Sequence, residues 1–369
     1  MYMKNTFGSS VSVTLFGESH GPFVGAVLDG LAPGIQVDED KIRQKMSLRS
    51  AFGKVSTARR ESDAIQFISG VFNGKTTGSP LCILIKNTDV RSNDYTKSRF
   101  LARPGHADYT AYCKYHGSED YRGGGHFSGR LTAPLVAVGA IASAALEEKG
   151  IVIGTHVKQC GRLTDRDFSD LQSDLRMLSQ KQFAVLDDRI EDEMIRLIEA
   201  AAAEKDSVGG ILETAVCGLP AGVGEPWFDT VEGLLSHMLF SIPAVKGVEF
   251  GAGFGFAVLC GSKANDPYAV QDGKIVTKTN NNGGVNGGIT NGMPLVFRTA
   301  VKPTPSIGIK QETVDFLQKV DADLEIIGRH DPAVIHRARI VVDSVTALVL
   351  CDLLSLRYGT DYFAPSETI

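Results

Sequence analysis

The chain has 369 residues, of which 43% are hydrophobic, with a formal net charge of −5 and an isoelectric point near 5.9. This composition is typical of a globular protein with a sizeable core. The acidic balance excludes a bulk nucleic-acid binder, so any anionic ligand has to be met by a local group of arginines. The six scattered cysteines form no C-x-x-C pair, which disfavours zinc and disulfides and favours reduced thiols in the cytoplasm.

Hydropathy along the chain predicts no membrane-spanning segment. The first residues, Met1 to Thr6, lack the apolar stretch of a signal sequence. The most apolar run, Leu135 to Leu146, is shorter than the roughly 18 residues that a membrane span requires. We therefore expect a cytoplasmic protein that binds neither membranes nor nucleic acids.

Hydrophobic periodicity predicts strands and helices in alternation. Period-two patterns predict half-buried strands at residues 11–15 and 212–216. Residues 131–149 are apolar nearly all round and predict a central helix, whereas residues 188–205 carry one apolar face and predict a surface helix. A final helix is predicted to begin with Asp331 as N-cap, followed by a proline, and to end at Gly359.

The strands and helices are interspersed without a strict βαβ rhythm, which favours the α+β class. The sequence contains no internal repeat, no low-complexity tail and no linker rich in serine or proline. We therefore expect residues 1–369 to form a single large domain.

Two short segments each place one histidine among glycines, prolines and hydroxyl groups. They are residues 17–21, Gly-Glu-Ser-His-Gly, and residues 103–108, Arg-Pro-Gly-His-Ala-Asp. An imidazole has little apolar packing to join there, and its ordinary pKa of about 6.5 suits proton transfer near neutral pH. His20 and His106 are therefore the candidate acid-base groups.

Glycine-rich loops and arginines gather in the same irregular parts of the chain. The loops at residues 122–130, 251–255 and 280–288 expose backbone amides that can bind phosphates or carboxylates, although none has nucleotide-binding spacing. Taken singly, each loop is explained by a tight turn and each arginine by a salt bridge; as a group they indicate an anion pocket. The arginines are Arg49, Arg59, Arg60, Arg103, Arg122, Arg130, Arg329, Arg337 and Arg339.

Two other kinds of catalytic site are disfavoured. The eight histidines include no i, i+4 helical pair and no H-x-H motif, so no metal site is expected. The chain also lacks the G-x-S-x-G elbow of a serine hydrolase.

Six segments in this order together resemble the chorismate synthase family over nearly the whole chain. They are residues 16–21, 103–108, 121–125, 244–249, 302–304 and 328–332. The resemblance implies a lyase of the shikimate pathway of aromatic amino acid biosynthesis. Its reaction would be the trans-1,4 elimination of phosphate from 5-enolpyruvylshikimate 3-phosphate to give chorismate. The family uses reduced FMN although no net redox change occurs, because the flavin can lend electron density as phosphate departs.

The resemblance also implies an architecture and an assembly. The family fold is a β-α-β sandwich with antiparallel sheets around a central helical layer, assembled as a homotetramer. The substrate carries one phosphate and two carboxylates, which accounts for arginines gathered in an acidic protein. No flavin reductase domain is recognisable, so we expect an external source of reduced flavin.

Site residues follow from the same resemblance. His20 would protonate the departing phosphate, and His106 would supply the proton that keeps the reduced flavin monoanionic. Asp331 would help to relay the substrate proton near flavin N5, unless it serves only as a helix N-cap. Arg49 and Arg130 would bind substrate. The FMN contacts would be His126, Phe127, Ser128, Gly287, Lys302, Pro303, Thr304, Pro305, Ser306 and Arg329.

Three positions depart from the common family pattern. Residues 48–51 read Leu-Arg-Ser-Ala where many members have three arginines and a proline, so Arg49 alone carries over, and Lys54 is the candidate for a further cation. Residues 126–131 read His-Phe-Ser-Gly-Arg-Leu in place of Arg-Ser-Ser-Ala-Arg-Glu. Pro243 stands where asparagine is common. None of these changes removes a proposed acid or base, so we expect activity to be retained.

Two alternative functions stay open at this point. One is a catalytically silent protein that binds a flavin or another anion. The other is a flavin-dependent reductase. The family is linked with NADP as well as FMN, but a reductase would need a nicotinamide site, and none is recognisable in the sequence.

Overall fold

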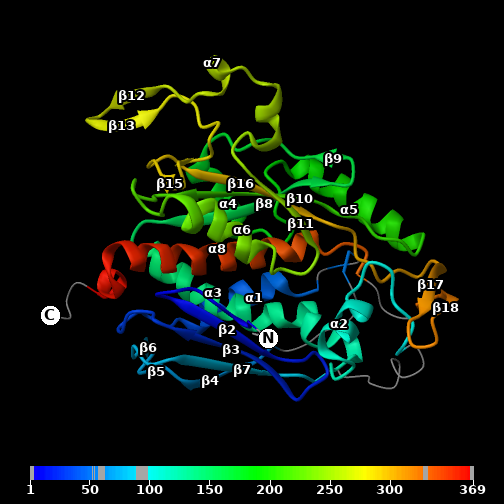
Figure 1. Ribbon diagram of the computed structural model, residues 1–369. Coiled ribbons are helices and arrows are strands. Elements are labelled where there is room, and N and C mark those ends of the chain that lie inside the picture. Colours follow the sequence, from blue (N-terminus) through cyan, green and yellow to red (C-terminus); the bar gives the residue numbers. More distant parts are fainter. Residues whose placement is uncertain are drawn as a thin grey trace.

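Two antiparallel sheets enclose a layer of helices (Figure 1) in the computed structural model, which describes residues 4–51, 53, 55–56, 63–88, 99–326 and 331–365. The first sheet has the order β1-β2-β3-β7-β4: β1 Thr6–Phe7, β2 Ser12–Gly17, β3 Phe23–Asp29, β7 Leu81–Lys86 and β4 Ile65–Ser69. The second has the order β11-β16-β10-β8-β9: β11 Val245–Phe250, β16 Leu295–Val301, β10 Gly210–Cys217, β8 Val152–Cys160 and β9 Leu163–Thr164. The predicted α+β sandwich is confirmed.

The other elements cover or extend this frame. The middle layer contains α1 Glu39–Arg49, α3 Thr132–Glu147, α6 Val231–Leu239 and α8 Ile335–Tyr358. The remaining helices are α2 Asp108–Tyr115, α4 Leu171–Leu178, α5 Asp188–Ala203 and α7 Gly261–Ala264. Four two-stranded hairpins are also described: β5 Val71–Phe72 with β6 Lys75–Thr76, β12 Tyr268–Gln271 with β13 Lys274–Thr277, β14 Val285–Asn286 with β15 Ile289–Thr290, and β17 Gln311–Asp315 with β18 Val320–Leu324.

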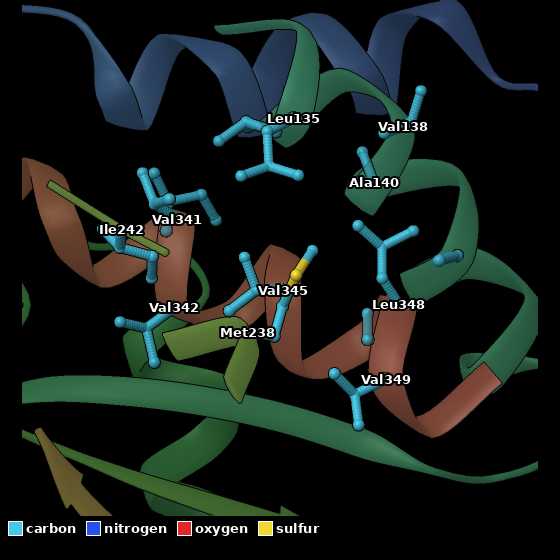
Figure 2. Close-up of a cluster of buried hydrophobic side chains, with 14 of the residues drawn as sticks. Leu135, Val138, Ala140, Met238, Ile242, Val341, Val342, Val345, Leu348 and Val349 are labelled. Atoms are coloured by element: carbon cyan, nitrogen blue, oxygen red, sulfur yellow. The ribbon is translucent and has the colours of Figure 1, made fainter. Parts of the chain in front are cut away.

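The centre of the core is the contact between α3 and α8. Figure 2 shows Leu135 of α3, Val345 and Leu348 of α8 and Met238 of α6 in one apolar cluster. The apolar surface that α3 carries on every side is buried because neighbouring helices and sheets surround it. The predicted helices at 131–149 and 188–205 are confirmed as α3 and α5. The prediction that residues 1–369 form a single domain stays a prediction.

The crossing of α3 and α8 depends on a glycine. A Cβ atom added at Gly139 would lie 2.7 Å from the Cα atom of Ser344, closer than nonbonded atoms can approach. We expect Gly139→Ala to lower the free energy of unfolding by about 1–3 kcal/mol, because the helices would have to separate in a closely packed core. Urea unfolding measures this, with Gly261→Ala in α7 as a control, because a Cβ added at Gly261 meets nothing within 4 Å and its φ is not in the left-handed region.

One apolar helical stretch of the described chain, Gly129–Glu147, meets the length and hydropathy of a membrane span. The prediction that the most apolar run is too short to span a membrane is therefore wrong when the whole helical stretch is counted. However, 89% of that stretch is buried inside the fold. The length of apolar sequence thus reflects the central position of α3 in the sandwich.

Strand β10 is buried on both faces, although period two predicted a half-buried strand. Leu212 and Val216 face the helical layer, whereas Ala215 packs in a second apolar cluster with Leu175 and Leu178 of α4. Helix α4 therefore covers the outer face of the second sheet at this point.

Helix α8 begins later than predicted. Its first residue is Ile335 and its N-cap position is Val334, so the prediction of Asp331 as N-cap is wrong. The Asp331 carboxylate instead pairs with Arg337, with Oδ2 2.8 Å from Nη1. The predicted end is confirmed, since Gly359 is the C-cap with a φ of 91°.

A histidine is buried in the first turn of α8. His336 is fully buried, and its Nε2 lies 2.7 Å from Ser56 Oγ. Burial, with a smaller effect from Arg337, lowers the pKa of His336 to about 3. The unfolded chain titrates near 6.5, so between these values it binds a proton that the folded chain does not.

We therefore expect stability to fall as the pH drops from about 6.5 towards 3, with a slope from this group of about 1.4 kcal/mol per pH unit. His336→Gln keeps an amide that can bond Ser56 and removes the titration, so its stability should depend less on pH in this window. Urea unfolding between pH 4 and 7 measures both slopes. Equal slopes in the two proteins would contradict the expectation.

Candidate active site

His20 lies in the turn that follows β2 and is only 7% exposed. The Ser19 amide donates to the Gly125 carbonyl at 3.1 Å, which ties this turn to the loop at residues 122–125. Ser19 Oγ lies 3.0 Å from His20 Nδ1 and 3.2 Å from the Arg122 carbonyl. A carbonyl only accepts, so a hydroxyl that donates to it accepts from Nδ1–H of the imidazole. The other ring nitrogen of His20, Nε2, is then the one that can exchange a proton.

Two consecutive glycines pack against the two histidines that the sequence singled out. Gly123 and Gly124 have φ angles of 58° and 88°. A Cβ at Gly123 would lie 2.1 Å from His20 Cε1, and a Cβ at Gly124 would lie 3.3 Å from His106 Cε1. The glycines are therefore required both by their backbone conformation and by the closeness of the imidazoles. The loop at residues 122–125 brings His20 and His106 into one region.

His106 is oriented by a carboxylate two residues further on. Asp108 Oδ1 lies 3.0 Å from His106 Nδ1, and Arg103 holds the same carboxylate through Nη2 at 2.6 Å and Nε at 2.8 Å. Burial of Asp108 opposes ionisation, but hydrogen bonds from Arg103 and His106 outweigh it and keep the pKa of the carboxyl well below its usual range. Arg103 Nη2 lies 3.2 Å from the same Nδ1. Asp108 and Arg103 therefore both meet the ring at Nδ1, and Nε2 is the nitrogen left for chemistry.

Arg49 at the end of α1 and Arg130 before α3 meet at one carboxylate. Asp63 Oδ2 lies 2.6 Å from Arg49 Nη2, and Asp63 Oδ1 pairs with Arg130 Nη1. Arg130 Nε donates to Asn87 Oδ1 at 2.9 Å. Burial of Asp63 opposes ionisation, but the two guanidinium groups outweigh it and lower the pKa of its carboxyl. The predicted substrate-binding arginines thus lie side by side.

Asp331 joins the same group through Arg337. Besides its pair with Asp331, Arg337 donates from Nε to the Arg49 carbonyl at 2.7 Å. The first turn of α8 is therefore connected to the end of α1. This contact places the predicted proton relay next to a predicted substrate ligand.

The segments predicted to contact FMN come from two parts of the chain. His126 Nδ1 donates to the Gly17 carbonyl at 2.9 Å. Lys302 donates from Nζ to the Gly105 carbonyl, next to His106. Burial, then the charge of Lys246, lowers the pKa of Lys302, so an anion placed there would be stabilised.

These side chains line an open cavity of about 1320 Å³. Among the residues that the structure describes, its lining includes six lysines and arginines and two carboxylates, so this part of the wall is positively charged in an acidic protein. The predicted site residues that line it are Arg49, His106, His126, Phe127, Ser128, Arg130, Lys302, Thr304, Pro305, Ser306 and Asp331. Its volume exceeds the about 300–1,000 Å³ of a usual ligand pocket, which leaves room for two ligands.

Some predicted residues are not among those that line the cavity. His20 lies behind Gly123, which is a lining residue, and Pro303 is exposed next to the lining residue Thr304. Gly287 lies in an exposed turn between β14 and β15, which the structure does not bring to this cavity. Arg329 and Lys54 fall outside the described residues.

The sequence did not single out four residues that the geometry adds to the site. Asp63 and Asn87 belong to none of the motifs, and their roles arise from tertiary contacts: Asp63 pairs with Arg49 and Arg130, and Asn87 accepts from Arg130. Arg337 was noted only as one of many arginines, and Lys246 only as part of a family segment. The sequence signal that could have found them is the group of arginines in irregular segments, because buried arginines require counter-ions in the fold.

The fold and this site define an enzyme in which a large cationic cavity lies next to two oriented histidines. Comparison with known proteins agrees. The chorismate synthase family model matches residues 11–355. Chorismate synthase from Dehalococcoides mccartyi is 46% identical over 359 residues, covering 97% of this chain and 98% of that protein. Chorismate synthase from Pyrococcus abyssi is 46% identical over 350 residues, covering 95% and 97%.

A solved crystal structure of chorismate synthase has a TM-score of 0.76 to this fold, with 28% sequence identity, and covers 96% of this chain and 94% of that one. The chain belongs to the chorismate synthase family. It is a lyase of the shikimate pathway, as the resemblance of its motifs implied. The predicted family, fold and activity are confirmed.

Proposed function

We propose that the cavity binds reduced FMN and 5-enolpyruvylshikimate 3-phosphate together and that its own side chains move the protons of the elimination. The observation that carries this proposal is the convergence of His106, Arg49 and Arg130 on one cationic cavity, with His20 directly behind the lining residue Gly123. The substrate has three anionic groups, and a flavin mononucleotide adds a further phosphate. A cavity with excess basic side chains suits both ligands.

The flavin side of the cavity is proposed to be the 302–306 segment with residues 126–128. Among the described residues, the buried Thr304 Oγ1 has no hydrogen-bond partner, which is expected of a group that binds a ligand. Phe127 offers an exposed ring to an aromatic cofactor, and Lys302 offers a cation. When bound, reduced flavin would supply electron density that assists departure of phosphate.

Three side chains are proposed to handle protons. His20 would protonate the leaving phosphate, with its Nδ1 side fixed by Ser19. His106 would donate a proton to the flavin from Nε2, since Nδ1 faces Asp108. Asp331, which is held by Arg337, would relay the proton removed from the substrate. These roles are distinct, so the two histidines do not share one proton.

The assembly is proposed to be a cytoplasmic homotetramer supplied with reduced flavin by a separate, NADP-linked enzyme. Large apolar side chains that are 72% to 92% exposed occur repeatedly between residues 227 and 275: Trp227, Phe228, Phe254, Val258, Val270 and Ile275. In Figure 1 the β12–β13 hairpin projects beyond the second sheet. Exposed apolar side chains of this number are typical of subunit contacts. Light scattering after gel filtration would measure the mass, and a monomer would contradict the proposal.

An anaerobic assay tests the reaction and both alternatives. The protein is mixed with photoreduced FMN and 5-enolpyruvylshikimate 3-phosphate, and phosphate release and chorismate absorbance are followed. Product formation supports the proposal, whereas binding without product indicates a silent binding protein. NADPH oxidation in the same mixture would favour a flavin reductase.

A further inference from the structure

Asn87 joins two parts of the site that lie far apart in the sequence. It directly follows strand β7 and is 7% exposed. Its amide donates from Nδ2 to the carbonyls of Glu18 at 3.0 Å and Gly21 at 2.8 Å, and its Oδ1 accepts from Arg130 Nε at 2.9 Å. One buried side chain thus contacts both the turn that contains His20 and an arginine that lines the cavity.

The contacts of Asn87 with the two carbonyls hold both ends of a tight turn. This turn begins at Glu18 and ends at Gly21, whose amide donates to the Glu18 carbonyl at 3.0 Å. Ser19 and His20 occupy the two central positions of the turn. Asn87 therefore supports the first and the last residue of the short segment that presents the imidazole.

The third contact of Asn87 orients the Arg130 guanidinium. Besides the bond from Nε to Asn87, Arg130 donates from Nη2 to the Lys86 carbonyl at 3.3 Å. Both acceptors lie at the end of β7, where the backbone amide of Asn87 also donates to the Pro22 carbonyl at 3.1 Å. The position of Asn87 is therefore set by the first sheet, and such a rigid element is what precise placement of a site requires.

The partners fix the direction of the Asn87 amide. A guanidinium N–H only donates and a backbone carbonyl only accepts, so Oδ1 has to face Arg130 and Nδ2 has to face the turn. Both N–H groups of Nδ2 are used by the two carbonyls. Leucine has a similar size but can make none of these contacts, so it would leave the carbonyls of Glu18 and Gly21 without this donor. The three contacts together require an amide at this position.

We propose that Asn87 is a positioning residue that couples anion recognition by Arg130 to proton donation by His20. Asn87 is not among the described residues that line the cavity, so it acts through these two side chains and not on the ligand itself. The inference rests on the proposed function for the roles of His20 and Arg130. The link keeps the acid at a constant position relative to the bound anion, and displacement of a reacting group by about 1 Å can cost about 10²-fold in rate.

A double-mutant cycle with His20 tests this coupling. We expect Asn87→Leu to lower kcat about 10–100-fold and to weaken substrate binding about three-fold or more, because both the acid and Arg130 lose their support. In the His20→Ala background the same substitution should lower kcat less than about three-fold, since no acid is left to misplace. The measurements are anaerobic phosphate release with reduced FMN and calorimetric binding of 5-enolpyruvylshikimate 3-phosphate. Gln159→Leu is the matched control, because the Gln159 amide also donates to a backbone carbonyl, that of Gly161 at 2.8 Å, outside the cavity lining, and its kcat should not change.

Unchanged kcat or unchanged substrate affinity in Asn87→Leu would overturn the inference. Losses that multiply in the double variant would also overturn it, because a generally loosened fold slows the enzyme with or without His20. If Asn87→Leu does not fold, Asn87→Asp takes its place in the kcat cycle, since it keeps an acceptor for Arg130 but loses the donors to the turn. Normal turnover in His20→Ala would reject the proposed role of His20 and the inference with it, whereas slow turnover in His20→Ala with multiplied losses would reject the inference alone.

Discussion

His106→Ala is expected to lower turnover by about 10²–10⁴-fold, the usual contribution of a general acid or base. Asp108 fixes Nδ1, so the other ring nitrogen is the one available for donation, and alanine removes it. The measurement is the rate of phosphate release under anaerobic conditions with reduced FMN. His116→Asn is a suitable control because His116 is an exposed histidine that ends α2 in the left-handed conformation, which asparagine also accepts. Turnover within about two-fold of normal in His106→Ala would exclude the role.

Asp108→Asn separates proton transfer from simple packing at the same site. The variant keeps the shape of the side chain but replaces the carboxylate that meets both Arg103 and His106, so the contact that orients the imidazole is weakened. We therefore expect turnover to fall while the affinity for substrate, whose proposed ligands are Arg49 and Arg130, changes little. A variant that only loosened the loop would lose substrate affinity and turnover together.

The periodicity of the chain predicted the helices better than the burial of the strands. Helix α3 could be predicted because a segment that is apolar on every side can be stable only in the interior. The outer burial of β10 could not be predicted, because Glu213 has the polarity of a solvent-facing position. In the structure, Glu213 Oε2 lies 3.0 Å from the buried His156 Nε2, which replaces the solvent. The sequence pattern of a strand therefore does not show whether a polar residue faces solvent or a buried polar partner.

The site shows the same division between local and tertiary information. The arrangement of His106 with Asp108 could be predicted, since both belong to one motif of six residues. The role of Asp63 could not, because it pairs with Arg130, which is 67 residues away in the sequence. Asp331 was assigned to a helix cap because aspartate before proline fits that role locally. Its pair with Arg337, in the first turn of α8, depends on where the helix begins.

His20→Ala is likewise expected to lower turnover by about 10²–10⁴-fold, because the departing phosphate would lose its proton donor. The proposed role requires the imidazole to hold a proton on Nε2 while Ser19 fixes Nδ1. Substrate affinity should change much less than turnover, since Arg49 and Arg130 are the proposed anion ligands. The measurements are kcat from anaerobic phosphate release and substrate binding by calorimetry.

His20→Asn distinguishes proton donation from support of the neighbouring loop. Asparagine can still bond Ser19 and fill part of the space next to Gly123, but it cannot transfer a proton at neutral pH. Equal losses in His20→Asn and His20→Ala would therefore assign the effect to proton transfer. Recovery of most of the activity in His20→Asn would instead make His20 a structural support of the loop at residues 122–125. In that case the proton for the leaving phosphate would have to come from another group in the cavity, and Lys302, with its lowered pKa, would be the first to test.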